Sequence, residues 1–170
     1  MRNSSLHICA LIPTYNNANT ILDVVRRTRK QLKDIIVVVD GCTDNTLDLL
    51  QELEFPITIV SYSKNKGKGY ALKQGFRKAI ELGFEYALTI DSDGQHYPED
   101  IPLLIDAIKK HPGSMIIGSR KLTSENVPGK NKFANKFSNF WFRLQTHINL
   151  PDTQTGFRIY PLNKLYGLSI

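Results

Sequence analysis

The middle of the chain reads Ala87-Leu88-Thr89-Ile90-Asp91-Ser92-Asp93-Gly94-Gln95-His96, a short apolar run that ends in two aspartates. The run from Tyr86 to Ile90 predicts a buried strand. Ligands in open α/β sheets bind beyond the carboxyl ends of the strands, which is where Asp91 and Asp93 fall. Side chains two residues apart on an extended segment share a face, so these carboxylates repel each other unless a cation or proton lies between them. A divalent cation that also bridges phosphates would satisfy both carboxylates; a solvated Asp-Ser-Asp-Gly turn is the alternative.

Strand and helix patterns alternate on both sides of this run. Apolar segments predict strands over residues 6–12, 35–39, 57–61, 86–90 and 114–118. Apolar residues at helical spacing predict helices over residues 21–32, 47–53, 67–82 and 101–108, the first capped at Asn19-Thr20 and the second at Thr43 or Asp44. Residues 157–160 are also typical of a strand. This order predicts an α/β fold with a largely parallel sheet and helices on both faces.

The composition is that of one globular domain. The chain has 170 residues, of which 41% are hydrophobic and 22% charged. No apolar run approaches the roughly 20 residues of a membrane-spanning helix, and residues 1–5 carry no secretory signal. Cys9 and Cys42 without such a signal favour reduced thiols and a cytoplasmic location.

The positive charge is concentrated in the last third of the chain. Residues 1–118 hold 14 basic and 14 acidic side chains, whereas residues 119–170 hold 8 basic and 2 acidic ones, so the excess of +6 lies there. This asymmetry predicts an anionic partner, such as a phosphate or an anionic lipid. Nucleic acid is not favoured, because the sequence contains no recognition helix or nucleic-acid-binding motif.

Within that third, residues 121–132 are polar and predict a mobile loop, and aromatic residues then recur at helical spacing up to Ile148. Basic side chains surround this aromatic stripe. A helix that packs on the sheet is one interpretation. A basic amphipathic helix over residues 130–148 that also contacts a membrane surface is the other, and the two are compatible.

Five motifs occur in one order along the chain. They are Ile12-Pro13-Thr14-Tyr15-Asn16-Asn17, Val37-Val38-Val39-Asp40-Gly41-Cys42-Thr43-Asp44, Asn65-Lys66-Gly67-Lys68-Gly69, Asp91-Ser92-Asp93-Gly94-Gln95-His96 and Asp152-Thr153-Gln154-Thr155-Gly156-Phe157-Arg158. Together they make the chain resemble the family 2 glycosyltransferases of GT-A fold. The resemblance is closest to the branch that transfers a sugar from a nucleotide to a polyprenyl (dolichyl-type) phosphate, and it covers residues 6–160.

The resemblance implies a three-layer α/β/α sandwich with a largely parallel, Rossmann-like central sheet. It implies a single catalytic domain over residues 1–170, in which residues 1–118 bind the nucleotide sugar and residues 119–170 lie on the acceptor side. Relatives normally continue beyond the position of Ile170, so we expect this acceptor-side segment to be incomplete.

The first three motifs are expected to bind the donor. Tyr15 can lie against a base, and Asp40 can accept the N–H of a pyrimidine or guanine ring, although relatives usually carry a second acid where this chain has Val39. Lys68 follows a glycine at a helix start, where anions are favoured. An ordinary loop and a solvated lysine are the alternatives. The expected donor-binding residues are Pro13, Tyr15, Asn16, Asp40, Lys68, Gly69, Asp91 and Ser92.

The fourth and fifth motifs are expected to carry the chemistry. By resemblance, Asp91, Asp93 and Gln95 hold Mg²⁺ or Mn²⁺, and His96 lies beside them as a hydrogen-bonding residue, with direct ligation as its alternative. The expected catalytic residues are Asp91, Asp93 and Asp152. Arg120 and Arg158 are expected on the acceptor side, since arginine suits bidentate contact with phosphate.

These residues predict an inverting, metal-dependent transferase. Its donor would be a UDP- or GDP-linked hexose, and its acceptor a polyprenyl phosphate or related lipid at the inner face of the membrane. One alternative is a family 2 enzyme that uses a saccharide hydroxyl in polysaccharide or glycolipid synthesis. The other is a truncated donor-binding module without turnover.

Overall fold

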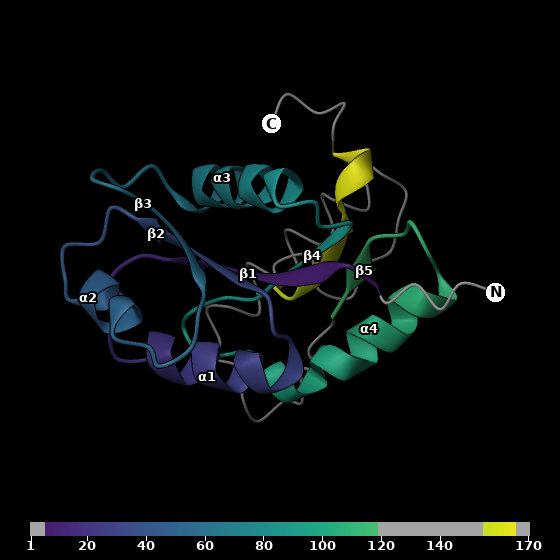
Figure 1. The fold of residues 1–170 in the computed structure, drawn as a ribbon, viewed down its shortest axis with the longest axis horizontal. Helices are drawn as coiled ribbons and strands as arrows, with labels where there is room; N and C mark the ends of the chain where they lie inside the picture. The colour runs from purple at the N-terminus through teal and green to yellow at the C-terminus, as the bar shows by residue number, and fades with distance from the viewer. Residues whose placement is uncertain (1–5, 119–154, 166–170) are drawn as a thin grey trace, which may run out of the picture.

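The computed structural model describes residues 6–118 and 155–165. Within these residues the strands are β1 (Ile8–Thr14), β2 (Ile35–Asp40), β3 (Thr58–Tyr62), β4 (Tyr86–Thr89), β5 (Ile116–Ile117) and β6 (Arg158–Pro161). The helices are α1 (Ile21–Gln31), α2 (Thr46–Gln51), α3 (Lys68–Glu81) and α4 (Ile101–Lys110), with short 3₁₀ turns at Pro98–Asp100 and Leu162–Lys164. Figure 1 shows their arrangement.

The described strands form a six-stranded sheet in the order β3-β2-β1-β4-β6-β5. Strand β1 pairs in parallel with β2 and β4, and β2 pairs in parallel with β3. Strand β6 lies antiparallel between β4 and β5. The predicted α/β fold with a largely parallel sheet is therefore confirmed. The sequence pattern suggested a strand at residues 157–160, but its place next to β4 is a finding of the structure.

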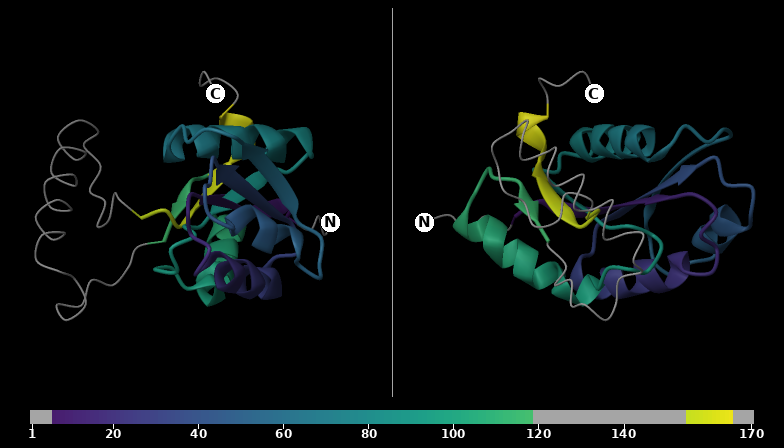
Figure 2. Two further views of the ribbon diagram at one scale, coloured as in Figure 1. Left: turned by 90° about the vertical axis from the view of Figure 1, so that its left-hand side faces the viewer. Right: turned by 180° about the vertical axis from the view of Figure 1, so that it is seen from behind.

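Helices cover both faces of the sheet. In Figures 1 and 2, α3 lies on one side of the strands, and α1, α2 and α4 lie on the other. All seven residues of β1 are buried, because consecutive side chains point to opposite covered faces. Ala10 and Ile12 pack in the cluster that contains the apolar face of α1, whereas Leu11 packs with Ala71 and Phe76 of α3. The result is the predicted three-layer sandwich.

The parallel strands place one set of ends together. The carboxyl ends of β1, β2 and β4 lie at the same edge of the sheet, because these three strands run in the same direction in adjacent positions. The loops that follow these strands therefore meet there, as expected for a ligand site in an open α/β sheet. None of the helices among residues 6–118 and 155–165 has the length and apolar character needed to cross a membrane.

Candidate active site

A cleft of about 310 Å³ opens at this edge of the sheet. Its lining comes from four separate parts of the chain: the loop after β1, the end of β2, the start of α3 and the turn after β4. The lining residues are Pro13, Thr14, Tyr15, Asn17, Asp40, Asn65, Gly67, Lys68, Ala71, Asp91, Ser92 and Asp93. The structure thus brings together six of the eight residues predicted to bind the donor. Among the described residues, the other two, Asn16 and Gly69, are not part of the lining.

The two aspartates after β4 have different surroundings. The carboxylate of Asp91 is partly buried, with the Nζ of Lys68 2.5 Å from its Oδ1 and the Nε2 of His96 3.6 Å from its Oδ2. Asp93 is exposed, and its Oδ1 accepts a hydrogen bond of 2.9 Å from the backbone N–H of Gln95. Asp91 is therefore paired with the ammonium group of Lys68 and adjoins the ring of His96, whereas Asp93 is bonded within its own turn.

These neighbours keep Asp91 ionised. Burial alone would raise the pKa of its carboxyl group, but His96 and Lys68 outweigh that effect and hold the pKa at about 2. His96 is itself buried, and its ring stacks on that of Phe157 at a centroid separation of 5.5 Å. His96 therefore lies beside the carboxylate, but at 3.6 Å it is beyond hydrogen-bond distance, and its role as a hydrogen-bonding residue stays a prediction.

The segment before β6 packs directly behind Asp91. A Cβ atom at Gly156 would overlap the Asp91 carboxylate, so the close approach of these two segments requires glycine. The hydroxyl of Thr89 donates a hydrogen bond of 2.6 Å to the carbonyl of Gly156, which fixes this approach. Gly156 lies within the fifth motif, but its role was not visible in the sequence.

Ser92 connects the acid pair, Asp91 and Asp93, to the start of α1. Its side chain is buried, and its Oγ accepts a hydrogen bond of 2.8 Å from the Nδ2 of Asn17. Thr20, at the predicted cap of α1, makes no side-chain capping bond; its hydroxyl donates instead to the carbonyl of Ser92, at 2.6 Å. These two hydrogen bonds therefore connect the segment before α1 to the acid motif, residues 91–96. The hydroxyl of Ser92 already has a hydrogen-bond partner within the protein.

The loops after β1 and β2 are joined by side chains. Asn16 has a positive φ of 50°, and its Oδ1 accepts a hydrogen bond of 2.8 Å from the N–H of Thr43. Asp44 accepts hydrogen bonds from the backbone N–H groups of Ala18 and Thr46, the latter at the start of α2. Burial alone would raise the pKa of the Asp44 carboxyl group, but hydrogen bonding, chiefly to Thr46, outweighs it and lowers the pKa. The N-cap of α2 is Asn45 and makes no side-chain capping bond, so the predicted cap at Thr43 or Asp44 is wrong; Asp44 instead bonds the start of the helix from the residue before the cap.

Asp40 closes the opposite end of the cleft. It is only 3% exposed, and its Oδ1 accepts a hydrogen bond of 2.8 Å from the backbone N–H of Lys66. Gly41, with a φ of +63°, lies so close to the backbone of Asn65 that a Cβ atom would overlap it. Burial and the Asp40 carboxylate together raise the pKa of the neighbouring Tyr62 phenol. Tyr15 is 46% exposed and lines the same cleft.

The residues present suit a hard divalent cation. Carboxylate and amide oxygens are the donors that Mg²⁺ and Mn²⁺ prefer, and Asp91 is ionised. The part of the chain that the structure describes contains no group of three or more His, Cys, Asp or Glu side chains placed to hold a metal ion. A site built on Asp91 and Asp93 therefore needs a further kind of donor, and the predicted one is the amide of Gln95.

Of the remaining predicted residues, the structure describes Arg158, whereas Arg120 and Asp152 lie outside the described residues. Arg158 begins β6, and its Nε donates a hydrogen bond of 2.8 Å to the carbonyl of Thr155. Its Nη1 lies 3.4 Å from the hydroxyl of Tyr160. The predicted loop over residues 121–132 and the basic segment over residues 130–148 also lie outside the described residues.

Comparison with known proteins identifies the family. The Glycosyl transferase family 2 model matches residues 9–165. The chain is 34% identical to a UDP-N-acetylglucosamine–dolichyl-phosphate N-acetylglucosaminyltransferase of Methanococcus voltae, covering 95% of this chain and 72% of the relative. It is 29% identical to an undecaprenyl-phosphate mannosyltransferase of Micrococcus luteus, covering 97% and 70%. A dolichol-phosphate mannosyltransferase of Pyrococcus furiosus is 34% identical, with 77% of this chain and 39% of the relative covered.

Solved structures confirm the fold. Glucosyl-3-phosphoglycerate synthase from Mycobacterium tuberculosis, in complex with Mn²⁺, UDP-glucose and phosphoglyceric acid, superposes with a TM-score of 0.73 at 17% identity, covering 95% of this chain and 59% of that one. TarS from S. aureus in complex with UDP-GlcNAc gives a TM-score of 0.65 at 20% identity, covering 94% and 46%. The chain spans about half the length of these structures. It has a GT-A fold and belongs to glycosyl transferase family 2.

Proposed function

We propose that this chain carries the donor site of an inverting, metal-dependent transferase, which moves a hexose from a UDP- or GDP-sugar to a polyprenyl phosphate or related lipid acceptor. The observation that carries the proposal is the cleft itself, which places the ionised Asp91 and the exposed Asp93 at one end and the buried Asp40 at the other. The lipid-phosphate acceptors named for the relatives from Methanococcus voltae and Micrococcus luteus support the choice of acceptor.

Each end of the cleft suits a different part of a nucleotide sugar. The Asp40 carboxylate accepts an N–H of the base, and Tyr15 covers a face of the ring. Lys68 and the first turn of α3 receive the diphosphate, because a lysine charge and a helix N-terminus both favour anions. The sugar then points toward Asp91 and the segment before β6.

A divalent cation would be held by Asp91, Asp93 and Gln95. When bound, it would supply positive charge against the departing nucleoside diphosphate. The Mn²⁺ and UDP present in glucosyl-3-phosphoglycerate synthase support this assignment. A phosphate acceptor is already ionised and needs no general base, so Asp152 would position the acceptor or sugar rather than remove a proton.

We further place the protein at the inner face of the membrane, with residues 130–148 as the contact, because the acceptor is a lipid. The excess positive charge of residues 119–170 supports this placement. Binding to vesicles that contain anionic lipid should be strong at low salt and weaken as salt is added. Equal binding to neutral and anionic vesicles would contradict an electrostatic contact.

A panel of nucleotide sugars tests the donor site. UDP- and GDP-linked hexoses are added with and without MnCl₂, and thermal stability is recorded, since a ligand of the folded state raises the unfolding temperature. We expect one base to stabilise the protein in a manganese-dependent way. Transfer to polyprenyl phosphate, with a phosphate-free saccharide as the alternative acceptor, then identifies the acceptor class. Absence of a shift with every nucleotide sugar would reject the proposed function.

A further inference from the structure

The ion pair between Lys68 and Asp91 occupies the place where the proposed cation would bind. The Nζ of Lys68 is 2.5 Å from Oδ1 of Asp91, and the Asp91 carboxylate is one of the two acids of the pair after β4. A lysine ammonium and a divalent cation on the same carboxylate repel each other. Lys68 must therefore move, at least in part, when a cation binds to Asp91.

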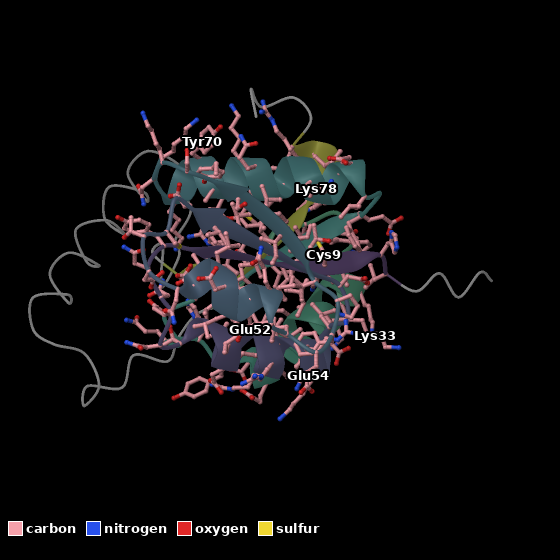
Figure 3. The ribbon with its side chains drawn as sticks, turned by 60° about the vertical axis from the view of Figure 1, so that its left-hand side comes forward. Cys9, Lys33, Glu52, Glu54, Tyr70 and Lys78 are labelled. Atoms are coloured by element: carbon pink, nitrogen blue, oxygen red, sulfur yellow. The ribbon has the colours of Figure 1, made fainter. Side chains whose placement is uncertain are left out.

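Lys68 is able to move. Its side chain is 54% exposed, compared with 21% for Asp91, and ion pairs that reach solvent are weak. The residue is the first of α3, so its ammonium group extends from a fixed backbone on a flexible four-carbon stem. Figure 3 shows Tyr70, two residues further on, near one end of α3, with Lys78 near the other end.

Asp91 does not depend on Lys68 for its position. His96 is buried against Phe157 and lies 3.6 Å from Oδ2, and Gly156 packs against the carboxylate. These neighbours stay in place when a lysine side chain rotates, because they are part of the packed sheet and its adjoining turn. The carboxylate can therefore exchange one cation for another without a rearrangement of the backbone.

The same cleft offers a place where a second partner of Lys68, a diphosphate, could bind. Lys68, Gly67 and Asn65 form the cleft lining at the start of α3, where the partial positive charge of a 14-residue helix attracts anions. A diphosphate bound there would be within reach of a lysine that has left Asp91. The lysine would then neutralise the anion instead of the acid.

We propose that Lys68 is shared between two partners: it neutralises Asp91 while the cleft is empty, and it transfers to the diphosphate of the donor when a divalent cation takes its place on Asp91. This inference rests on the proposed function and extends it. If Lys68 is shared in this way, binding of the cation strengthens binding of the nucleotide and the reverse also holds, because both depend on the movement of the same side chain.

The variant Lys68→Met separates this role from a structural one, because it should change the affinities for Mn²⁺ and for the nucleotide in opposite directions. Without the competing ammonium group, Mn²⁺ alone should bind about threefold to tenfold more tightly. Without a phosphate partner, UDP or GDP in the presence of Mn²⁺ should bind about tenfold more weakly. Both affinities are measured by titration calorimetry with MnCl₂ and with the nucleotide that gave the larger thermal shift.

Lys64→Met is the matched control. It removes the same charge from an exposed lysine that does not line the cleft, so both affinities should stay within about twofold of the unsubstituted protein. Weaker or unchanged Mn²⁺ binding in Lys68→Met would overturn the sharing of Lys68, while nucleotide binding by the unsubstituted protein would leave the proposed function intact. Failure of that protein to bind any nucleotide would instead reject the proposed function, and the inference with it.

Discussion

The two ends of the cleft each hold a carboxylate, but they hold it by different means. Asp40 is 3% exposed, and a backbone N–H group, that of Lys66, is bonded to its Oδ1. Asp91 is reached by two side chains, those of Lys68 and His96, and is partly open to solvent. A backbone donor cannot rotate away, whereas a lysine side chain can. We infer that the Asp40 end is formed in advance, and that the Asp91 end rearranges as ligands bind.

The largest effect should come from Asp93→Ala, which tests the end that rearranges. Metal-dependent nucleotide binding should be lost, with affinity falling by about a hundredfold or more, because the cation loses one of its two carboxylates. The thermal unfolding temperature without ligand should hardly change, since Asp93 is exposed. Calorimetric affinity in the presence of MnCl₂ is the measurement. A nucleotide affinity equal to that of the unsubstituted protein would show that the acid pair, Asp91 and Asp93, is not part of the donor site.

Asp40→Ala tests the preformed end and should have the next largest effect. Nucleotide affinity should fall about tenfold to a hundredfold with or without MnCl₂, because the base loses its acceptor and the N–H of Lys66 loses its partner. The increase in nucleotide affinity that MnCl₂ produces should persist. Calorimetry at zero and saturating MnCl₂ measures both quantities. If the increment disappeared as well, the two ends could not be treated as separate.

Gly156→Ala asks whether the packing behind Asp91 matters. The added methyl group would overlap the carboxylate, so we expect a destabilisation of about 1–3 kcal/mol together with weaker Mn²⁺ binding. Thermal unfolding and metal titration provide the two values. Gly69→Ala is the control, since no atom lies within 4 Å of the position of its Cβ, and it should be neutral or slightly stabilising. Equal behaviour of the two variants would show that Asp91 needs no such support.

The smallest effect concerns an ion pair outside the cleft. Arg27 of α1 donates hydrogen bonds of 2.9 and 2.6 Å to Glu99, in the turn that follows the acid motif. These hydrogen bonds from Arg27 lower the pKa of Glu99 from 4.5 to about 2. Because the pKa of Glu99 is lower in the folded state, its pairing with Arg27 contributes fully to the free energy of unfolding above pH 4.5. This contribution is lost as the pH falls toward 2.

Glu99→Gln should therefore flatten the acid side of the stability profile slightly, as measured by thermal unfolding between pH 5 and about 2. Lys78 and Glu81 of α3 form another exposed pair, at 2.7 Å, and Glu81→Gln provides the comparison. A large loss of nucleotide binding in Glu99→Gln would show that this turn participates in the site, contrary to our expectation.

Part of the site could be predicted because it depends on short-range pattern. Each of the motifs that line the cleft follows a strand whose apolar run is visible in the sequence, and parallel strands bring their carboxyl ends to one edge. Asp40, Lys68, Asp91 and Asp93 were predicted in this way. Gly156, Asn17 and the backbone of Lys66 were missed, although all three lie within the quoted motifs. Their roles depend on which distant segment each one contacts.

The amino-acid sequence by itself determined the alternation of strands and helices, the family, and the acid pair at the end of β4, because periodicity and strand ends are properties of neighbouring residues. Only the tertiary structure decided that β6 lies between β4 and β5, that Gly156 packs against Asp91, and that Lys68 pairs with that carboxylate. These contacts join residues from separate elements. They exist only once the sheet has assembled, because the free energy of packing, and not local pattern, selects which segments meet.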